Sequence, residues 1–543
     1  MVRASAPVNL LYSDKTLGIE QINTPEADGV PGITQWPIQP GGTFTYRWRA
    51  DQYGSYWYHS HSRGQIEDGL FGSIVIKPRS DIANPFNKIA PDEVEWLAMA
   101  EAEVKPLLLS VWNHRTSSQI LEDQVASGLE TSLCLDSILV NGKGSVDCWS
   151  RKEIDQYTGG DFAPLLSPGN LSLTDKGCLP PAVFQTRQGP DTGIDPSVLP
   201  PQVYYECSPT NGSREAIRVS SYKKWAAFDI ISAASVSTLA FSMDEHPMWV
   251  YAVDGHYIEP LKVDSLIVSN GERYSIFIRL DKPAKNYGVR VASLGQTQLL
   301  DTTSVLSYDH RLNYSHSHHV AMNDSGRLMS VPYTNRAGLP TSGNVTIFNQ
   351  SQMISFPPQF PRPPPPVAQT FKLAMGSVVN AYTFALNATP FDHHILEGTN
   401  LPLLYQPPNL NNPGGNVTIV TQNDTWIDLV FLVPSFPAPP HPIHKHSNKA
   451  FILGTGEGDF TWATIEEAAT ALPDKFNLVD PPYRDTFVSL PATTMPTWLA
   501  VRYHVVNPGP FLIHCHIDSH LSGGMAMVIL DGVDEWPEVR EDR

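Results

Sequence analysis

Short runs of partly alternating residues recur along most of the chain. They mix β-branched and aromatic residues with polar ones and are punctuated by Gly and Pro, a pattern typical of strands. The runs expected as strands are 42–49, 53–62, 70–77, 107–112, 138–141, 226–231, 249–253, 274–280, 417–421, 425–433, 497–505 and 524–530. One helix is expected over 464–472, where a Glu- and Ala-rich segment follows Thr464 as its cap. The pattern predicts an all-β protein.

Two proline-containing segments divide these strands into three groups. Residues 78–92 are polar with three prolines, and 355–366 read SFPPQFPRPPPP, a stiff extended linker by composition. We therefore expect a first unit at 1–88, a second at 93–350, a linker at 351–366 and a third at 367–543. A chain of 543 residues exceeds the common size of one domain, which agrees with this division.

The composition argues against nucleic-acid binding and against a membrane span. The formal net charge is −18, whereas phosphate binding needs clustered Lys and Arg, so nucleic acid is not an expected partner. No run of 18 apolar residues exists, so no membrane span is expected.

The cysteines and sequons favour the secretory route. Four cysteines lie close together and Cys515 stands alone, so two disulfides and one separate thiol are expected, with three pairings open. Five reduced thiols in a cytosolic protein are the alternative. Nine Asn-x-Ser/Thr triplets begin at Asn170, Asn211, Asn313, Asn323, Asn344, Asn349, Asn387, Asn416 and Asn423. Residues 1–20, however, contain no apolar core of a signal peptide.

Histidines are paired far more often than chance predicts. With 18 histidines in 543 residues, about 0.6 His-x-His pairs are expected. The chain has pairs at His59/His61, His316/His318, His444/His446 and His514/His516. Along a strand, residues i and i+2 project from the same face. Each pair on a strand therefore aims two imidazoles at one place.

The segment LIHCHIDSH adds a thiol to this pattern. His514 and His516 project from one face of a strand while Cys515 projects from the other, so three consecutive residues serve two metal sites. His520 returns to Cys515 after a turn, Met525 lies ten residues beyond it, and His441 is free to face away from its neighbours His444 and His446. One Cys, two His and a distant Met form the ligand set of a blue copper site. Zinc is the alternative for a lone His-x-His pair, but structural zinc usually draws on paired cysteines.

Several motifs resemble those of multicopper oxidases, and ascomycete laccase-like enzymes most of all. They are DGVPGITQWPI (28–38), YWYHSHS (56–62) followed by DGLFG (68–72), HPIHKH (441–446) and HCHIDSHLSGGM (514–525). The resemblance implies three cupredoxin-like domains of Greek-key β-barrel or sandwich form, with one type 1 copper in the last domain. It also implies a trinuclear copper cluster between the first and last domains.

The resemblance assigns copper ligands by position. The type 1 copper would be held by His441, Cys515 and His520, with Met525 as its weak axial ligand. His444 would be a type 2 ligand. The type 3 pair would be held by His59, His61, His446, His514 and His516.

One family motif is not present. The family carries His-x-His-Gly shortly before the DGVP segment, whereas this stretch reads KTLGIEQ (15–21), with Lys15 and Leu17 at the histidine positions. The first domain, its earlier strands and the type 2 and type 3 ligand sets are therefore expected to be incomplete. We expect upstream exons to carry the motif and a signal peptide. The competing interpretation is a natural protein that binds a single blue copper and does not reduce oxygen to water.

The resemblance also implies a reaction. Substrate molecules each give one electron to the type 1 copper, and the electrons pass through Cys515 to His514 and His516 and reduce O2 to water. An axial Met lowers the type 1 potential, which favours electron-rich phenols. Small phenolic or aromatic substrates tied to pigment and polyketide coupling are expected, with a secreted or cell-wall location and a monomeric state. A ferroxidase, with Glu130 and Asp136 as acidic candidates, and a non-catalytic copper protein remain alternatives.

Three carboxylates are candidates for proton transfer. Asp136 matches the laccase pocket carboxylate that receives the phenol proton, with a turn Asp as the alternative. Asp28 and Asp518 resemble the carboxylates that supply protons to the cluster, although Asp28 also suits a turn before Gly. Six other histidines match no copper motif: His316, His318 and His319 are expected in a solvated loop, and His246, His393 and His394 are expected to be structural.

Overall fold

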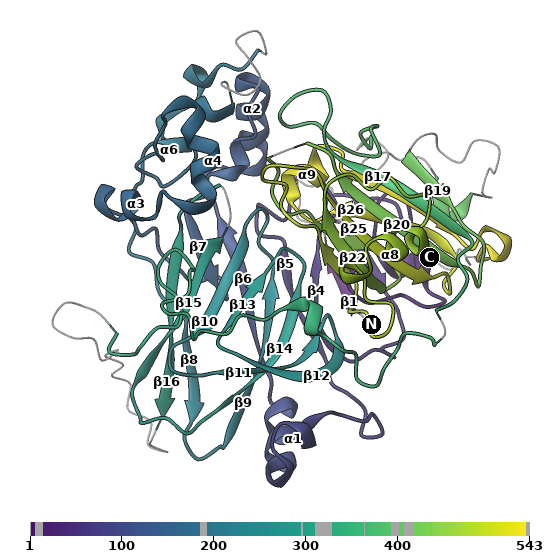
Figure 1. The fold of residues 1–543 in the computed structure, drawn as a ribbon, viewed down its shortest axis with the longest axis horizontal. Coiled ribbons are helices and arrows are strands. Elements are labelled where there is room, and N and C mark those ends of the chain that lie inside the picture. Colours follow the sequence, from purple (N-terminus) through teal and green to yellow (C-terminus); the bar gives the residue numbers. More distant parts are fainter. Residues whose placement is uncertain are drawn as a thin grey trace.

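The protein is described from a computed structural model in which strands dominate (Figure 1). It describes residues 2–5, 15–184, 193–294, 297–309, 328–362, 364–392, 401–406, 417–435 and 437–538. Each of the twelve expected strand segments contains a strand, and the expected helix is α8 (Ile465–Ala471), whose cap Thr464 accepts a hydrogen bond from the N–H of Glu467. The all-β prediction is confirmed.

The first unit forms two small antiparallel sheets. Their strands are β1 (Val2–Ser5), β2 (Lys15–Leu17), β3 (Thr43–Tyr46), β4 (Gly54–His59) and β5 (Phe71–Ile76). One sheet has the order β2-β4-β5 and the other pairs β1 with β3. The central strand β4 is almost wholly buried and ends at His59.

The second unit is a two-sheet sandwich. One sheet has the order β12-β11-β14-β9-β6-β7 and the other β13-β10-β15-β16-β8. Apolar side chains from both sheets pack into one large core between them. The strands are β6 (Lys105–Trp112), β7 (Ser137–Val140), β8 (Ala216–Ser220), β9 (Trp225–Ser232), β10 (Thr238–Met243), β11 (Met248–Val253), β12 (His256–Val263), β13 (Ser265–Val268), β14 (Arg273–Arg279), β15 (Asn286–Leu294) and β16 (Asp301–Asp309).

A helical region, not expected from the sequence, extends from the second unit beside the third (Figure 1). Its helices are α2 (Ser117–Ser127), α3 (Arg151–Tyr157), α4 (Ala163–Leu166) and α6 (Pro201–Tyr204), while α1 (Val94–Ala102) packs elsewhere on the second unit. Both disulfides lie here, Cys134–Cys178 and Cys148–Cys207, which resolves the pairing that the sequence left open.

The third unit is another two-sheet sandwich. One sheet has the order β18-β17-β20-β25-β22-β23 and the other β19-β27-β26-β21-β24. The strands are β17 (Gln369–Ser377), β18 (Phe384–Leu386), β19 (Thr418–Val420), β20 (Trp426–Val433), β21 (Pro442–Lys445), β22 (Ala450–Glu457), β23 (Tyr483–Arg484), β24 (Thr486–Val488), β25 (Thr497–His504), β26 (Gly509–Cys515) and β27 (Ala526–Asp531). The short helix α9 (Asp518–Ser522) joins β26 to β27.

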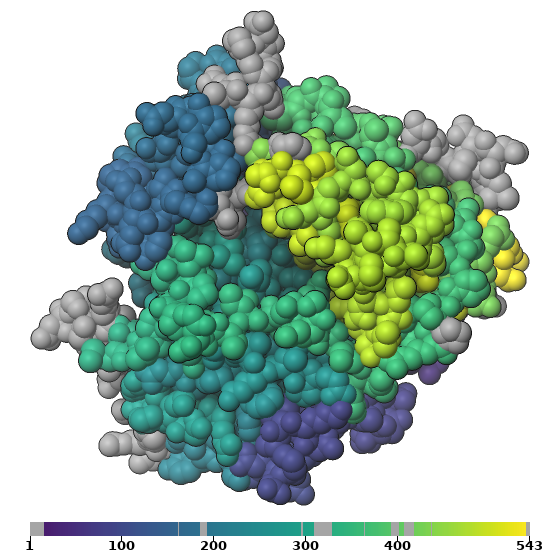
Figure 2. Space-filling view, viewed as in Figure 1, coloured from purple at the N-terminus to yellow at the C-terminus, as the bar shows by residue number. Residues whose placement is uncertain are grey.

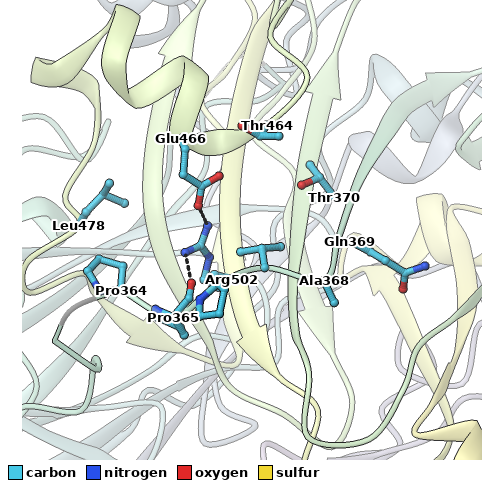
Figure 3. A pocket seen from close by; sticks show the side chains of 11 residues that line it. Pro364, Pro365, Ala368, Gln369, Thr370, Thr464, Glu466, Leu478 and Arg502 are labelled. Carbon is cyan, nitrogen blue, oxygen red and sulfur yellow. Dashed lines mark hydrogen bonds and ion pairs between the residues drawn. The ribbon is translucent and has the colours of Figure 1, made fainter.

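The proline-rich segment before β17 lies against the third unit. Pro364 and Pro365 line a cavity of about 550 Å³ together with Arg502 and Glu466 (Figure 3). The Arg502 guanidinium donates to the carbonyl of Pro365 and pairs with Glu466 and the buried Asp428. This contact fixes the end of the segment on the sandwich.

A buried ion network joins the three units. The Nη2 atom of Arg273, on β14, lies 2.7 Å from Oδ2 of Asp485 in the third unit, and Nζ of Lys449 lies 3.1 Å from the same oxygen. Lys449 also donates to the carbonyl of Gly18, and Nε of Arg273 to that of Ser55, both in the first unit. Because buried charges are costly unless they are paired, this network favours one arrangement of the units.

Candidate metal centre

A buried thiol and two imidazoles converge inside the third unit. Sγ of Cys515 lies 3.7 Å from Nδ1 of His441 and 3.7 Å from Nδ1 of His520. All three residues are buried, and their possible ligand atoms lie within 4.8 Å of one another. The fully buried Met525 accepts the backbone N–H of Cys515 at 3.0 Å and belongs to the same apolar cluster.

The local sequence explains this arrangement. Cys515 ends β26 and points into the apolar core, because its neighbours His514 and His516 project from the other face. The turn of α9 returns His520 toward the thiol, and its N–H donates to the carbonyl of Ile517 at 3.0 Å. His441 immediately precedes β21. Burial, and then the neighbouring His520, lowers the pKa of His441 well below its ordinary value, so this imidazole is neutral and able to bind a metal.

Six further histidines gather between the first and third units. Ring centroids are 4.7 Å apart for His59 and His61, 5.1 Å for His59 and His516, and 5.4 Å for His514 and His516. His444 lies 5.2 Å from His446. Within this group, His61, His446 and His514 bring their ligand atoms within 4.8 Å of one another. In each of the three His-x-His pairs, the two rings therefore lie close together, as alternation along a strand predicts.

Hydrogen bonds fix the tautomers of four of these imidazoles. Nδ1 of His444 donates to the carbonyl of Asp485 (2.9 Å), that of His514 to the carbonyl of Cys515 (2.8 Å), and that of His59 to the carbonyl of Ser60 (3.0 Å). Nδ1 of His446 lies 2.8 Å from a carboxylate oxygen of Asp28. With the proton on Nδ1, the lone pair is on Nε2, the atom that can bind a metal.

The chemistry of the two donor sets differs and suits copper. A thiolate with two Nδ1 imidazoles and a nearby thioether is a blue copper ligand set, whereas the second set consists of imidazoles alone. Zinc sites built from paired cysteines do not match, because Cys134, Cys148, Cys178 and Cys207 are all in disulfides.

Comparison with known proteins gives the family. Three models described as multicopper oxidase match residues 15–81, 103–311 and 384–535. Laccase abr2 of Aspergillus fumigatus is 41% identical over 532 residues, which are 97% of this chain and 86% of that protein. The chain belongs to the multicopper oxidase family. It is a laccase-like, copper-dependent oxidoreductase.

Other relatives of this multicopper oxidase agree. Laccase-1 of Emericella nidulans is 36% identical over 536 residues, covering 96% of this chain and 86% of that protein. The solved laccase of Botrytis aclada superimposes with a TM-score of 0.67 at 22% identity, covering 99% of this chain and 81% of that one. The multicopper oxidase Fet3p, which functions in iron import, gives 0.63 at 18% identity, covering 98% and 83%. These two structures show the shared fold, and the cupredoxin-like expectation is confirmed.

One of the predicted carboxylates, Asp28, contacts a histidine of the cluster, and a second, Asp518, follows His516 by two residues. Asp28 is fully buried and contacts His446, as described above. The N–H of Asp518 donates to the carbonyl of Ser235, and burial, followed by the nearby Asp68, raises the pKa of Asp518 to about 7. Their roles in proton transfer remain predictions.

The third predicted carboxylate, Asp136, makes its contacts within the helical region. Its Oδ1 lies 2.8 Å from Nζ of Lys176, and its Oδ2 accepts the N–H of His114 at 2.8 Å. Burial raises its pKa, but Lys176 and His114 outweigh this and hold the pKa below its ordinary value. The structure shows no contact between Asp136 and the Cys515 site among the residues it describes.

Glu130, which the sequence offered only as an acidic candidate for a ferroxidase, is a carboxylate that lies at the Cys515 site. Its Oε1 accepts the hydroxyl of Ser519 at 2.6 Å and lies 3.4 Å from Nε2 of His520. The surface is hollowed where the blue helical region, which carries Glu130, faces the yellow C-terminal segment (Figure 2). The sequence did not predict the contact between Glu130 and His520, because this contact depends on a helical region that was not expected.

Of the six histidines that the sequence predicted not to bind copper, one lies among the described residues. His246 is buried, with Nδ1 at 2.7 Å from the carbonyl of Asp244 and Nε2 at 2.6 Å from the hydroxyl of Tyr308, which is consistent with a structural role. His316, His318, His319, His393 and His394 lie outside the described residues. No helix among the described residues has the length and apolar character needed to cross a membrane.

Proposed function

We propose that this laccase-like oxidase takes electrons from small phenolic or aromatic molecules at the Cys515 site. The observation that carries the proposal is the geometry of Cys515, whose sulfur faces Nδ1 of both His441 and His520 at 3.7 Å. His441, Cys515, His520 and Met525 would hold a copper ion there, and this ion would supply one-electron redox chemistry. Cys515 then connects this site to the imidazole cluster through its chain neighbours, His514 and His516.

The ligand assignment for the cluster is part of the proposal. His444 is assigned to the type 2 position, and its Nδ1 proton is held by the carbonyl of Asp485. The type 3 positions are assigned to His59, His61, His446, His514 and His516. In the family this cluster reduces O2, and Asp28 and Asp518 are proposed as the nearby proton sources.

Glu130, rather than Asp136, is proposed to receive the proton of the phenol. Glu130 reaches the outer nitrogen of His520, so a phenol seated against that imidazole would meet this carboxylate. Asp136 is engaged by Lys176 and His114, which makes it the weaker base. The rest of the substrate proposal, a pigment or polyketide precursor, is supported by the HSHSRG and HPIHKHSNKAF motifs. A secreted, glycosylated state is supported by two disulfides and nine sequons.

Oxygen uptake by the purified chain tests the proposal. We expect uptake with a simple phenol, no uptake with ferrous iron alone, and complete loss of the phenol reaction in Cys515→Ser. Uptake with ferrous iron only would support a ferroxidase, and no uptake with either would support a non-catalytic copper protein.

A matched pair of variants separates the two carboxylates. Glu130→Gln should keep the blue absorption of the copper–thiolate site but lower kcat/KM for the phenol by roughly a hundredfold, because general base catalysis typically contributes that much. Asp136→Asn should change kcat/KM only slightly. The reverse result would return the role to Asp136.

A further inference from the structure

Strand β2 occupies the place of the family motif that this chain lacks. β2 pairs with β4 in antiparallel register, with Lys15 opposite His59 and Leu17 opposite Trp57. Directly opposed residues of an antiparallel pair project from the same face, and so do residues two apart. Leu17 therefore lies on the face of the sheet that carries His59. At this position of β2, the chain has the hydrocarbon side chain of Leu17, whereas the family has an imidazole.

Leu17 packs with Trp57, whose ring lies next to both His59 and His516. It is fully buried and belongs to a small apolar cluster with Trp57, Ile231 and Ala233. The Trp57 ring centroid is 4.4 Å from that of His59 and 5.4 Å from that of His516. The apolar side chains that pack with Trp57 offer no lone pair to a metal.

A second group in the cluster, by contrast, contains three histidines that can bind one metal ion. His61, His446 and His514 converge within 4.8 Å, and hydrogen bonds to Asp28 and the Cys515 carbonyl orient two of them. Among the described residues, this group and the His441–Cys515–His520 group are the two sets of three that could hold a metal ion. Three neutral imidazoles bind Cu²⁺ more tightly than other divalent first-row metals.

We infer that this chain holds copper firmly at two places, the Cys515 site and a three-imidazole site of His61, His446 and His514, and that Leu17 withholds the third donor from the His59/His516 pair. The inference rests on the ligand assignment of the proposed function, and it predicts that the oxygen uptake of this chain is limited because the His59/His516 pair lacks a donor. The inferred two-copper pattern differs from the four-copper pattern of the family. The difference arises from Lys15 and Leu17, which lie on strand β2, paired with β4.

Copper counting on the full chain tests this. After loading with copper(II) and exhaustive dialysis, mass spectrometry of metal content should give about two copper ions per chain. His61→Ala should lower the content to about one and keep the blue absorption, whereas Cys515→Ser should remove the blue absorption and leave about one. These losses do not require any new residue to fit into the core.

Adding the missing imidazole should add a metal. Leu17→His is expected to raise the content to about three copper ions per chain with unchanged blue absorption, which also reports an intact third unit. Ile22→His, at a nearby exposed position, is the matched control and should leave about two.

The outcomes separate this inference from the proposed function. A wild-type chain without blue absorption would contradict the assignment of the Cys515 site and therefore the proposed function. Three outcomes in a blue protein would overturn the inference alone. The wild-type chain could hold three or four copper ions, or it could retain zinc at the three-imidazole site. A folded, blue Leu17→His variant could hold no more copper than the wild type.

Discussion

At the scale of single residues, we expect the contact between Asp28 and His446 to influence how firmly the proposed three-imidazole site holds a metal. Both residues are fully buried, and the carboxylate lies 2.8 Å from Nδ1. In Asp28→Ala this N–H loses its acceptor, a cost of about 1–3 kcal/mol. The orientation of the imidazole is then no longer fixed. Loss of such a partner typically weakens metal binding roughly 10–100-fold, which the rate of copper loss to a chelator would measure.

Asp28→Asn is the control for this contact. Asparagine keeps an oxygen that accepts from Nδ1 but removes the negative charge, so copper retention should lie near that of the wild type. If Asp28→Ala retained copper as firmly as Asp28→Asn, the hydrogen bond would not be what orients His446. Asp28 would then act only through its charge or as part of the turn before Gly29.

At the scale of elements, the short helix α6 holds the loop that carries Glu130. The hydroxyl of Tyr204 is buried and donates to the carbonyl of Glu130 at 2.9 Å. Tyr204→Phe leaves that carbonyl without its donor, at a cost of about 1 kcal/mol. Since Glu130 reaches His520 from this loop, we expect KM for a phenol to rise more than kcat falls.

Steady-state oxygen uptake measures both KM and kcat. The control is Tyr205→Phe, at an exposed neighbour, which should behave as the wild type. A Tyr204→Phe variant with unchanged KM would contradict this role of α6.

The elements also show what the sequence could predict. Strands such as β4 and β20 were predictable because β-branched and aromatic residues dominate them, and α8 because Thr464 begins it. The orientation of the His-x-His pairs was also predictable, because residues two apart on a strand project from the same face of the sheet.

The helical region could not be predicted in the same way. Its helices α2 and α3 begin with capping boxes at Thr116 and Ser150, but they are short and their apolar positions form no strong stripe. A small apolar core and two disulfides stabilise the region, and neither follows from local pattern. The contact between Glu130 and His520 was therefore not predictable from the sequence.

At the scale of the whole molecule, the network around Asp485 connects the packing of the units to the cluster. Its carboxylate pairs with Arg273 of the second unit and with Lys449, while its carbonyl accepts Nδ1 of His444. Burial raises the pKa of Asp485, but Arg273 and Lys449 outweigh it and hold the pKa well below the ordinary value of 3.8. A carboxyl whose pKa is lower in the folded state stabilises that state above its ordinary pKa, and the contribution is lost as the pH falls below it.

Asp485→Asn tests this linkage. At neutral pH the variant leaves Arg273 and Lys449 buried without their shared counter-charge, and breaking a buried pair costs about 3–5 kcal/mol. We expect a clearly lower melting temperature at pH 7 and a difference from the wild type that shrinks as the pH falls below about 4. Because His444 is oriented by the backbone of residue 485, displacement of that segment should disturb the cluster, whereas the blue absorption of the Cys515 site should persist. A melting difference that stays constant from pH 7 to pH 3 would show that the charge of Asp485 does not hold the units together, and that the packing of their sheets does so alone.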